Sequence, residues 1–192
     1  MRKYPVLYKK YFVDKGDERL DLFRIIFKEF DIQKGLYPGS FTHITPSLVI
    51  PEMAYVDSDK RCEKFYQSNN TETFVFKNKE YDASPLFRFH QADFSVKLDE
   101  EDNYFDLLIS LYAGFISKYC QRYLKKGGIL LANNSHGDAP LAYIDENFEF
   151  IGVINVDFVR HHEVVFEMPK RFFRDDVAGY KVLCHFSGRP IV

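Results

Sequence analysis

The sequence lacks several features that would place a chain in a particular class. It has no tryptophan, and its three cysteines, Cys62, Cys120 and Cys184, are scattered along the chain. Neither a zinc site nor a disulfide framework fits an odd and scattered set, so we expect reduced thiols and a cytoplasmic location. No apolar run approaches the length of a membrane-spanning helix, and no apolar signal core follows the charged N-terminus. We therefore expect no membrane partner.

The chain also lacks an excess of either charge. Its formal net charge of -2 gives no general attraction to nucleic acid, so we expect no nucleic-acid partner. Aromatic side chains are abundant, with 20 Phe and 13 Tyr, which favours an aromatic-rich core over a base-stacking surface. A length of 192 residues suits one domain. We expect a single domain over residues 1–192, with a helix at about 17–30 and a core at about 34–192.

Strand and helix patterns alternate along most of the chain, which predicts an α/β fold with a mostly parallel sheet. Seven strands are predicted, at 35–37, 53–56, 86–92, 105–110, 129–132, 148–154 and 180–185. The apolar residues of VVFEMP, from Val164, could add a further strand. Helices are predicted at 17–30, from Thr45 as N-cap, after Ser58 or Asp59, and at 116–124 with Gly127–Gly128 as the stop. The polar segment 68–82 is predicted to be a loop with a strand-like TFVF.

The segment Lys34 to Cys62 carries the clearest functional pattern, with a strand, a tight turn at Gly39, a short helix and a strand ending in Asp57. A strand-to-helix turn presents free backbone N–H groups and the positive end of a helix dipole to an anion. An acidic residue at the end of the next strand is well placed to bind ribose hydroxyls. The segment therefore predicts a nucleoside-type cofactor at the carboxyl ends of the strands. The G-x-G-x-x-G pattern of dinucleotide enzymes is absent.

The distal half of the chain resembles the class I S-adenosylmethionine-dependent methyltransferases. The run FDLLISLYAGFISKYCQRYLKKGGILLANN is similar to the fourth strand, following helix and fifth-strand entry of that family. FEFIGVI and YKVLCHF would be its sixth and seventh strands. The resemblance implies a three-layer, Rossmann-like methyltransferase fold, with a mostly parallel seven-stranded sheet and a C-terminal antiparallel hairpin. It also implies S-adenosylmethionine as cofactor.

The resemblance assigns cofactor-binding roles to residues at the strand ends. Gly39 would be the first glycine of the turn, followed by Ser40, and Asp57, followed by Ser58, would hold the ribose hydroxyls. Asp93 would accept a hydrogen bond from the adenine amino group, with Phe94 against the ring. Ser110 and Leu111, with Tyr112, would lie beside the methionine part. No metal ligand and no catalytic residue are assigned.

The turn departs from the family pattern at three positions. Tyr37, which is also assigned to the cofactor site, stands where an acidic residue is usual, and Phe41 and His43 replace the second and third glycines. Glycine there lets the backbone approach the ligand and adopt a positive φ. Three alternatives follow: the turn takes another path, the cofactor sits differently, or cofactor binding has been lost. His43 itself could be a substrate base or a residue that lines the pocket.

Other polar residues have both a functional and a structural interpretation. The loop Asn133–Asp138 follows a predicted strand and could hold a general base or be a solvated loop. Asp106 lies at the start of an apolar strand, where a structural hydrogen bond is the favoured role. The adjacent His161 and His162 with Glu163 invite a metal site, but neighbouring strand residues point to opposite faces. We therefore expect no metal there.

Three functional hypotheses remain open. The first is a methyltransferase that acts on a small-molecule acceptor, of which the sequence gives no further description. The second is a methyltransferase-like module that no longer methylates and serves in binding or interaction. The third is another nucleotide-cofactor enzyme of Rossmann type, such as a nicotinamide oxidoreductase.

Overall fold

The computed structural model describes residues 3–155, 164–165 and 180–187. The chain divides into two compact units, Met1–Asp93 and Phe94–Val192, and each is described by itself. That the 192 residues form one methyltransferase-like domain stays a prediction.

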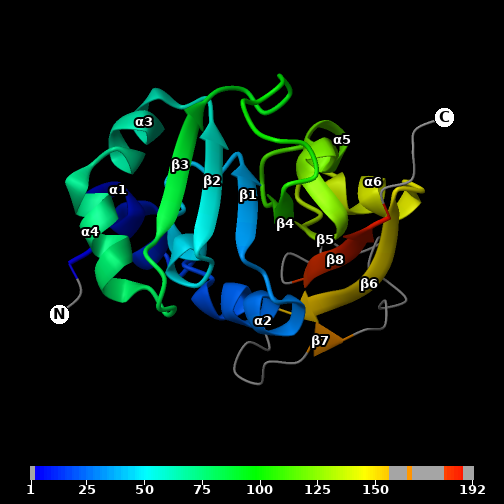
Figure 1. Ribbon diagram of the computed structural model, residues 1–192, viewed down its shortest axis with the longest axis horizontal. Coiled ribbons are helices and arrows are strands. Elements are labelled where there is room, and N and C mark those ends of the chain that lie inside the picture. The colour runs from blue at the N-terminus through cyan, green and yellow to red at the C-terminus, as the bar shows by residue number, and fades with distance from the viewer. Residues whose placement is uncertain (1–2, 156–163, 166–179, 188–192) are drawn as a thin grey trace. The chain divides into compact units, whose positions relative to one another are not determined.

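The first unit contains three parallel strands with β2 in the middle (Figure 1). They are β1 (Lys34–Pro38), β2 (Glu52–Asp57) and β3 (Leu86–Gln91). The register pairs Tyr37 with Tyr55 and Asp57 with Gln91. Because the strands are parallel, the ends of β1 and β2 place the Gly39 turn and Asp57 at the same edge. All three strands were predicted from the sequence and are confirmed.

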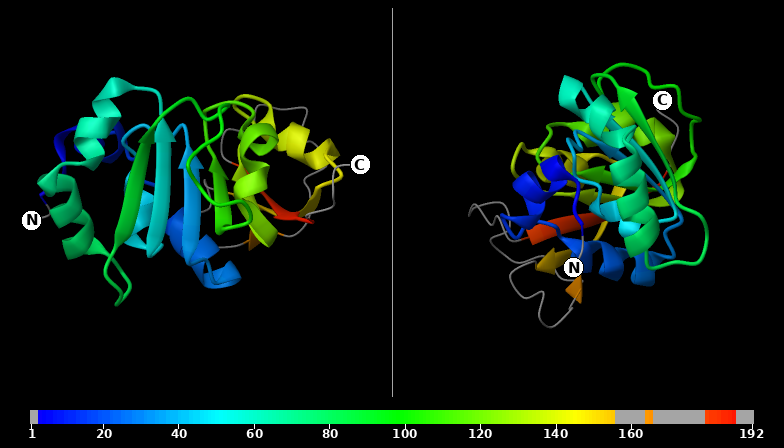
Figure 2. Two further views of the ribbon diagram at one scale, coloured as in Figure 1. Left: turned by 45° about the horizontal axis from the view of Figure 1, so that its top comes forward. Right: turned by 90° about the vertical axis from the view of Figure 1, so that its left-hand side faces the viewer.

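The helical elements of this unit follow apolar patterns and side-chain caps. They are α1 (Val6–Tyr8), the π-helix η1 (Lys9–Val13), α2 (Leu20–Phe30), the 3₁₀ helix η2 (Thr45–Leu48), α3 (Lys60–Tyr66) and α4 (Asn69–Asn78). The predicted helix at 17–30 is α2, which buries Leu22, Phe23, Ile25 and Ile26. Asp59 caps α3 by accepting a hydrogen bond from the backbone N–H of Arg61 at 2.9 Å. Figure 2 shows α3 and α4 on the β3 side of the unit.

Two sequence predictions in this unit are wrong. Residues 68–82 were predicted to be a loop, but the Ser68 side chain caps helix α4 and Phe74 of that helix packs against Tyr4 and Tyr8. Tertiary packing of the N-terminal segment thus decides the local structure. Thr45 was predicted to cap a helix, but η2 is a single short turn and the Thr45 hydroxyl is bonded to Tyr8 instead.

The second unit contains the remaining strands. β4 (Phe105–Ser110) and β5 (Leu124–Ala132) are parallel. β8 (Tyr180–Phe186) is antiparallel to β5 and to β6 (Phe148–Asn155), and a two-residue strand, β7 (Val164–Val165), pairs with β6. The expected antiparallel pairing of 148–154 with 180–185 is therefore confirmed. Every residue of β4 is buried, as its continuous apolar run predicts.

The helices of the second unit are short. α5 (Ile116–Cys120) packs against β4, and α6 (Asp138–Ile144) packs against β6 and β8. The helix predicted over 116–124 ends at Cys120 and continues as the 3₁₀ helix η3 (Gln121–Tyr123). Gly127 and Gly128 were predicted to stop that helix, but they lie inside β5, where Gly127 has a φ of 78°. The Lys125 ammonium is held there by the Asp106 carboxylate at 2.5 Å, a structural pairing for Asp106.

His161, His162 and Glu163 lie outside the described residues. Elsewhere, in residues 3–155, 164–165 and 180–187, no group of three or more His, Cys, Asp or Glu side chains could hold a metal ion. Among the same residues, no helix is long and apolar enough to cross a membrane.

Candidate functional site

The turn after β1 is tightly ordered by its own backbone. The N–H groups of Gly39 and Ser40 both donate to the carbonyl of Val56, at 2.7 and 3.3 Å. The N–H of His43 donates to the carbonyl of Ser40 at 3.0 Å. Gly39 has a φ of 65°, the left-handed conformation that glycine adopts without strain. The first glycine of the resemblance therefore occupies a position that requires glycine-like freedom.

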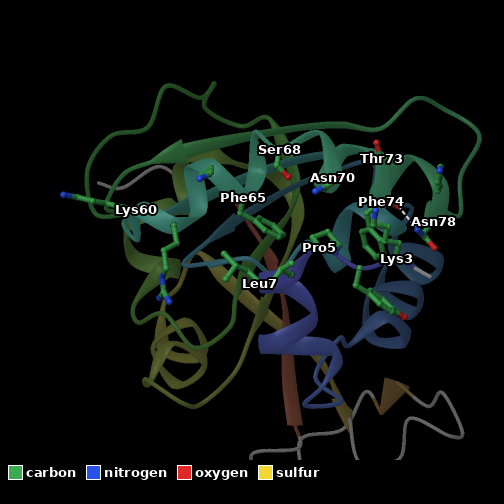
Figure 3. Close-up of a pocket in the computed structure, with 15 residues that line it drawn as sticks. Lys3, Pro5, Leu7, Lys60, Phe65, Ser68, Asn70, Thr73, Phe74 and Asn78 are labelled. Atoms are coloured by element: carbon green, nitrogen blue, oxygen red, sulfur yellow. Dashed lines mark hydrogen bonds between the residues drawn. The ribbon is translucent and has the colours of Figure 1, made fainter. Parts of the chain in front are cut away.

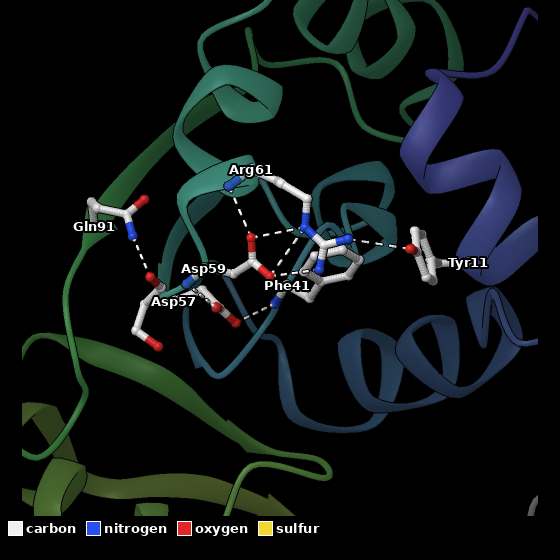
Figure 4. A network of polar contacts seen from close by, with 7 residues as sticks. Tyr11, Phe41, Asp57, Asp59, Arg61 and Gln91 are labelled. Atoms are coloured by element: carbon white, nitrogen blue, oxygen red, sulfur yellow. Dashed lines mark hydrogen bonds and ion pairs between the residues drawn. The ribbon is translucent and has the colours of Figure 1, made fainter.

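Phe41 keeps the backbone conformation that a second glycine would allow. Its φ is 45°, which is uncommon and strained for a bulky residue. Its ring lies edge-on to Tyr11, with 5.0 Å between centroids, and the Arg61 guanidinium lies 4.8 Å from its centroid. Figure 4 shows the ring on the Tyr11 side of the turn, with Gln91 on the other side of Asp57. A phenylalanine at the position of the second glycine therefore does not change the left-handed conformation of the turn.

Asp57 ties this turn to the start of α3. One carboxylate oxygen accepts the N–H of Phe41 and the other accepts the N–H of Asp59, both at 2.8 Å (Figure 4). A carboxylate offers about four acceptor positions on its two oxygens. The two oxygens therefore still have room to accept from a pair of ligand hydroxyls. This is the chemistry that ribose recognition needs, and in this respect the side chain fits a nucleoside cofactor.

Thr42 is a candidate that the sequence reasoning missed. Its side chain is fully buried, and its hydroxyl oxygen has no hydrogen-bond partner among the described residues. A buried hydroxyl without a partner costs about 1–3 kcal/mol, so native proteins seldom keep one. Its position between Phe41 and His43, inside the aligned glycine turn, was the only signal in the sequence. Protein atoms cover this oxygen, so a polar ligand would bond to it only after the turn opens.

His43 belongs to the packed core of the first unit. Its Nε2–H donates to the carbonyl of Glu18 at 3.0 Å, and its Nδ1 therefore accepts from the Tyr37 hydroxyl at 3.1 Å. Its ring stacks on Phe12 with 4.3 Å between centroids. Burial, with a contribution from the Arg19 charge, lowers the pKa of His43 to about 3. His43 is thus neutral and fully bonded, and Tyr37 serves as its partner.

The other predicted residues of the first unit lie close to the turn. The Ser40 hydroxyl is buried and accepts from the Tyr66 hydroxyl at 3.3 Å. Ser58 is exposed, and its carbonyl accepts from the Gln91 side chain at 2.7 Å. Asp93 is exposed and follows β3. Their roles toward a cofactor stay predictions.

In the second unit, Ser110 belongs to a buried polar cluster around Asp138. The Ser110 hydroxyl donates to the Asp138 carboxylate, which also accepts the hydroxyl of Ser117 at 2.5 Å and its N–H at 3.0 Å. Burial raises the pKa of Asp138, although these hydrogen bonds act in the opposite direction. The cluster joins the end of β4 to the starts of α5 and α6. The Ser110 side chain is therefore fixed by a hydrogen bond within the second unit.

The loop after β4 contains Leu111 and Tyr112, which the sequence predicted to lie beside the methionine part. Leu111 is buried, and Tyr112, which follows it, has a φ of 66°. Strained positions of this kind gather at functional sites. The Phe94 carbonyl accepts from the Cys120 thiol at 3.6 Å. Contacts of Leu111 and Phe94 with a cofactor stay predictions.

The loop after β5 orients a possible base. The Ser135 hydroxyl donates to the side-chain oxygen of Asn133 at 3.0 Å and lies 2.9 Å from Nδ1 of His136. Because the single Ser135 proton is used by Asn133, Nδ1 of His136 must be the donor in their contact. The neutral ring therefore carries its free lone pair on Nε2. His136 is exposed and can accept a proton there.

Comparison with solved structures identifies the fold. The chain is similar to a protein of Methanococcus maripaludis assigned to the S-adenosyl-L-methionine-dependent methyltransferases, at 14% identity and a TM-score of 0.56, with 97% of this chain and 92% of that chain covered. A methyltransferase from Geobacter sulfurreducens matches at 10% identity and a TM-score of 0.55, covering 89% and 80% of the two chains. The [4+2]-cyclase SpnF matches at 12% identity and a TM-score of 0.53, covering 93% and 83%. No family model and no curated protein matches the sequence.

The chain therefore has the class I, Rossmann-like fold of the S-adenosylmethionine-dependent methyltransferases. This confirms the predicted α/β class, with mostly parallel strands and an antiparallel C-terminal pair. Identities this low identify the fold alone, so the cofactor and the reaction need an argument from the residues of this chain.

Proposed function

We propose that the protein is an S-adenosylmethionine-dependent methyltransferase that acts on a small-molecule acceptor. The observation that carries the proposal is the buried, unpartnered hydroxyl of Thr42, in the turn that Asp57 orders. The fold supports it, because two of the similar structures are described as methyltransferases. The three cysteines are free and buried, which agrees with a reducing, cytoplasmic location.

Each residue of the turn has a separate part in holding the cofactor. Asp57 accepts the ribose hydroxyls with the acceptor positions that Phe41 and Asp59 leave open. Thr42 would offer its hydroxyl to a polar group of the cofactor once the turn opens. Gly39 and Phe41 keep the backbone path in left-handed conformations. When bound, the cofactor supplies a methyl group already activated by its sulfonium, so the protein has mainly to align the acceptor and exclude water.

Considered by itself, the second unit offers a candidate base, His136, for an acceptor that carries its proton on oxygen. The contacts with Ser135 and Asn133 leave Nε2 as the atom that accepts the proton. An imidazole nitrogen with a free lone pair is a common general base in enzymes.

Calorimetric titration with S-adenosylmethionine and S-adenosylhomocysteine tests cofactor binding, with NADH as the control ligand. Asp57→Asn keeps the shape of the side chain but removes its charge and half of its acceptor capacity. We expect this variant to bind both ligands about tenfold to a hundredfold more weakly, because hydrogen bonds to a charged group contribute about 1.5–3 kcal/mol. Asp99→Asn, at an exposed position of the other unit, is the matched control and should bind normally. Equal affinity of Asp57→Asn and the unmodified protein would contradict the role of Asp57.

Thr42→Val gives a second and independent test, because the two side chains have nearly the same shape. Removing an unpartnered buried hydroxyl should leave the ligand-free protein as stable as before, or about 1 kcal/mol more stable. The same change should weaken cofactor binding. The matched control is Thr71→Val, because Thr71 is equally buried but its hydroxyl lies 3.2 Å from that of Ser68, so this change should destabilise. A Thr42→Val protein that is less stable and binds normally would show that Thr42 is structural.

A second candidate function is a methyltransferase-like module that does not methylate. It is favoured by the turn itself, since the N–H groups of Gly39, Ser40 and Phe41 are all bonded within the protein. The similarity to SpnF, which is described as a cyclase, supports the possibility of another reaction on this fold. The titration separates the two functions. Absence of binding by a folded protein supports the second, whereas saturable binding of both adenosyl ligands supports the first.

A further inference from the structure

The first unit contains a large groove that is separate from Asp57 and Thr42. Its volume is about 1050 Å³, which is enough for an organic ligand. It lies between the N-terminal segment at Lys3–Leu7, helix α3 and helix α4, and we call it the α1–α4 groove (Figure 3). Because all of its lining residues belong to one unit, the groove is complete within that unit.

The charges around the α1–α4 groove have one sign. Five of the fifteen lining residues are cationic and none is acidic; the cations are Lys3, Lys60, Arg61, Lys64 and Lys77. The acidic residues of α3 and α4, Glu63 and Glu72, do not line it. Arg61 is already paired with Asp59 at 2.6 Å. Within the described residues, none of the four lysines forms an ion pair, so their charge is available to a ligand.

The interior of the α1–α4 groove is apolar. Figure 3 shows Pro5, Leu7 and Phe65 in the middle, with Lys60 at one end and Lys3 at the other. The Tyr4 and Phe74 rings lie against each other at 5.4 Å between centroids. Val6, which also lines the groove, is 80% exposed. An apolar interior with cations at its ends complements a molecule with an apolar body and an anionic end.

We propose that the α1–α4 groove binds a small anionic amphiphile of the alkyl carboxylate class. Lysines at one end of the groove hold the carboxylate, and Leu7, Phe65 and Val6 contact the chain. An acidic peptide is a poorer complement, because it would place several charges and amides against apolar side chains. A free inorganic anion would use the lysines but leave the apolar interior in water. The proposal is independent of the methyl-transfer proposal, since the groove contains neither Asp57 nor Thr42.

Calorimetric titration of the full chain with dodecanoate, below its micelle concentration, tests the proposal. The controls are dodecanol, dodecyltrimethylammonium and inorganic phosphate, which separate the apolar and the anionic contributions. We expect saturable binding of dodecanoate, at least about tenfold weaker binding of dodecanol, and no binding of the cation or of phosphate. Equal affinity for dodecanoate and dodecanol would overturn the proposal, because it would show an apolar surface without charge recognition. Absence of saturable dodecanoate binding would also overturn it.

Variants locate the site. In Lys64→Gln/Lys77→Gln, dodecanoate affinity should fall severalfold, because the variant removes two cations from the lining of the groove. Lys28→Gln/Lys118→Gln, which removes two exposed lysines outside the groove, is the matched control and should bind normally. Val6→Ser changes a largely exposed side chain, so it should fold normally and bind severalfold more weakly. An equal loss of affinity in both lysine pairs would reject this location.

Discussion

At the scale of single residues, Phe41 shows how a turn can lose a glycine and keep its path. A left-handed backbone costs a bulky residue about 1–2 kcal/mol. The edge-on contact with Tyr11 contributes about 0.5–1.5 kcal/mol in the other direction, and the Arg61 guanidinium over the ring adds to it. These terms are of similar size, so the turn can retain φ 45° without glycine. The energetics therefore do not require the turn to take another path, which is one of the three alternatives that the sequence left open.

A pair of substitutions separates the strain at Phe41 from its contacts. Phe41→Ala and Phe41→Gly remove the same contacts with Tyr11 and Arg61, but only glycine relieves the left-handed backbone. Phe41→Gly should therefore be about 1 kcal/mol more stable than Phe41→Ala in urea unfolding. Two variants of equal stability would show that the backbone at Phe41 is not left-handed in solution.

His43 predicts how stability depends on pH. Burial holds its pKa at about 3 in the folded protein, while an unfolded chain has an ordinary value of about 6.5. Between these values the unfolded state binds a proton and the folded state does not. The stability is therefore fully present above about pH 6.5 and is lost as the pH falls. At pH 5 the loss from this group is about 2 kcal/mol.

The measurement is the free energy of unfolding of the protein and of His43→Gln between pH 5 and 7. The variant should be less stable at neutral pH, because Glu18 and Tyr37 lose a well-placed partner. Its stability should nevertheless depend less on pH, since the titrating group has gone. Parallel pH profiles for both proteins would refute the assignment of His43 as a buried neutral group.

At the scale of elements, the sequence predicted the strands better than the helices. Strands such as 105–110 are fixed by continuous apolar runs, which the sequence displays directly. Helix α4 was missed because its order depends on Phe74 packing against Tyr4 and Tyr8, about seventy residues away. The prediction that the helix at 116–124 stops at Gly127–Gly128 was wrong, because two glycines also fit an irregular strand such as β5. Local signals cannot weigh such tertiary contacts.

The residues of the candidate site also fall into those that the sequence could reveal and those that it could not. Gly39 and Asp57 could be found because strand ends and acidic residues are visible in a sequence. Thr42 could not, because an unpartnered hydroxyl is defined by what surrounds it in space. The partners of Ser110 were equally hidden, since Asp138 lies 28 positions away.

The Asp138 cluster should hold the elements of the second unit together. Its carboxylate accepts hydrogen bonds from Ser110 at the end of β4 and from Ser117 of α5. In Asp138→Asn an amide N–H₂ group replaces one carboxylate oxygen, so two of these donors lose their acceptor. The free energy of unfolding should therefore fall by about 2–4 kcal/mol. Ser110→Ala removes one donor only and should cost less. The measurement is urea unfolding, and equal losses in the two variants would contradict a central role for the carboxylate.

At the scale of the whole molecule, the three thiols report on how the chain unfolds. Cys62 lies in the first unit, and Cys120 and Cys184 lie in the second. All three are buried, and burial raises each thiol pKa to about 12. Since the thiolate is the reactive form, a disulfide reagent should react only after the structure opens. The rate of reaction therefore measures the opening free energy around each cysteine.

Two single-cysteine variants test whether the chain is one domain. One keeps Cys62 and the other keeps Cys184, with the remaining cysteines changed to Ala. If residues 1–192 fold as one cooperative domain, both thiols become reactive with the same opening free energy and the same dependence on urea, and that free energy equals the value for global unfolding. The matching global values, measured on each variant by circular dichroism, correct for any stability lost through the substitutions. Reaction of Cys62 at a lower urea concentration than Cys184, relative to those values, would show that the first unit opens alone and that the single-domain prediction is wrong.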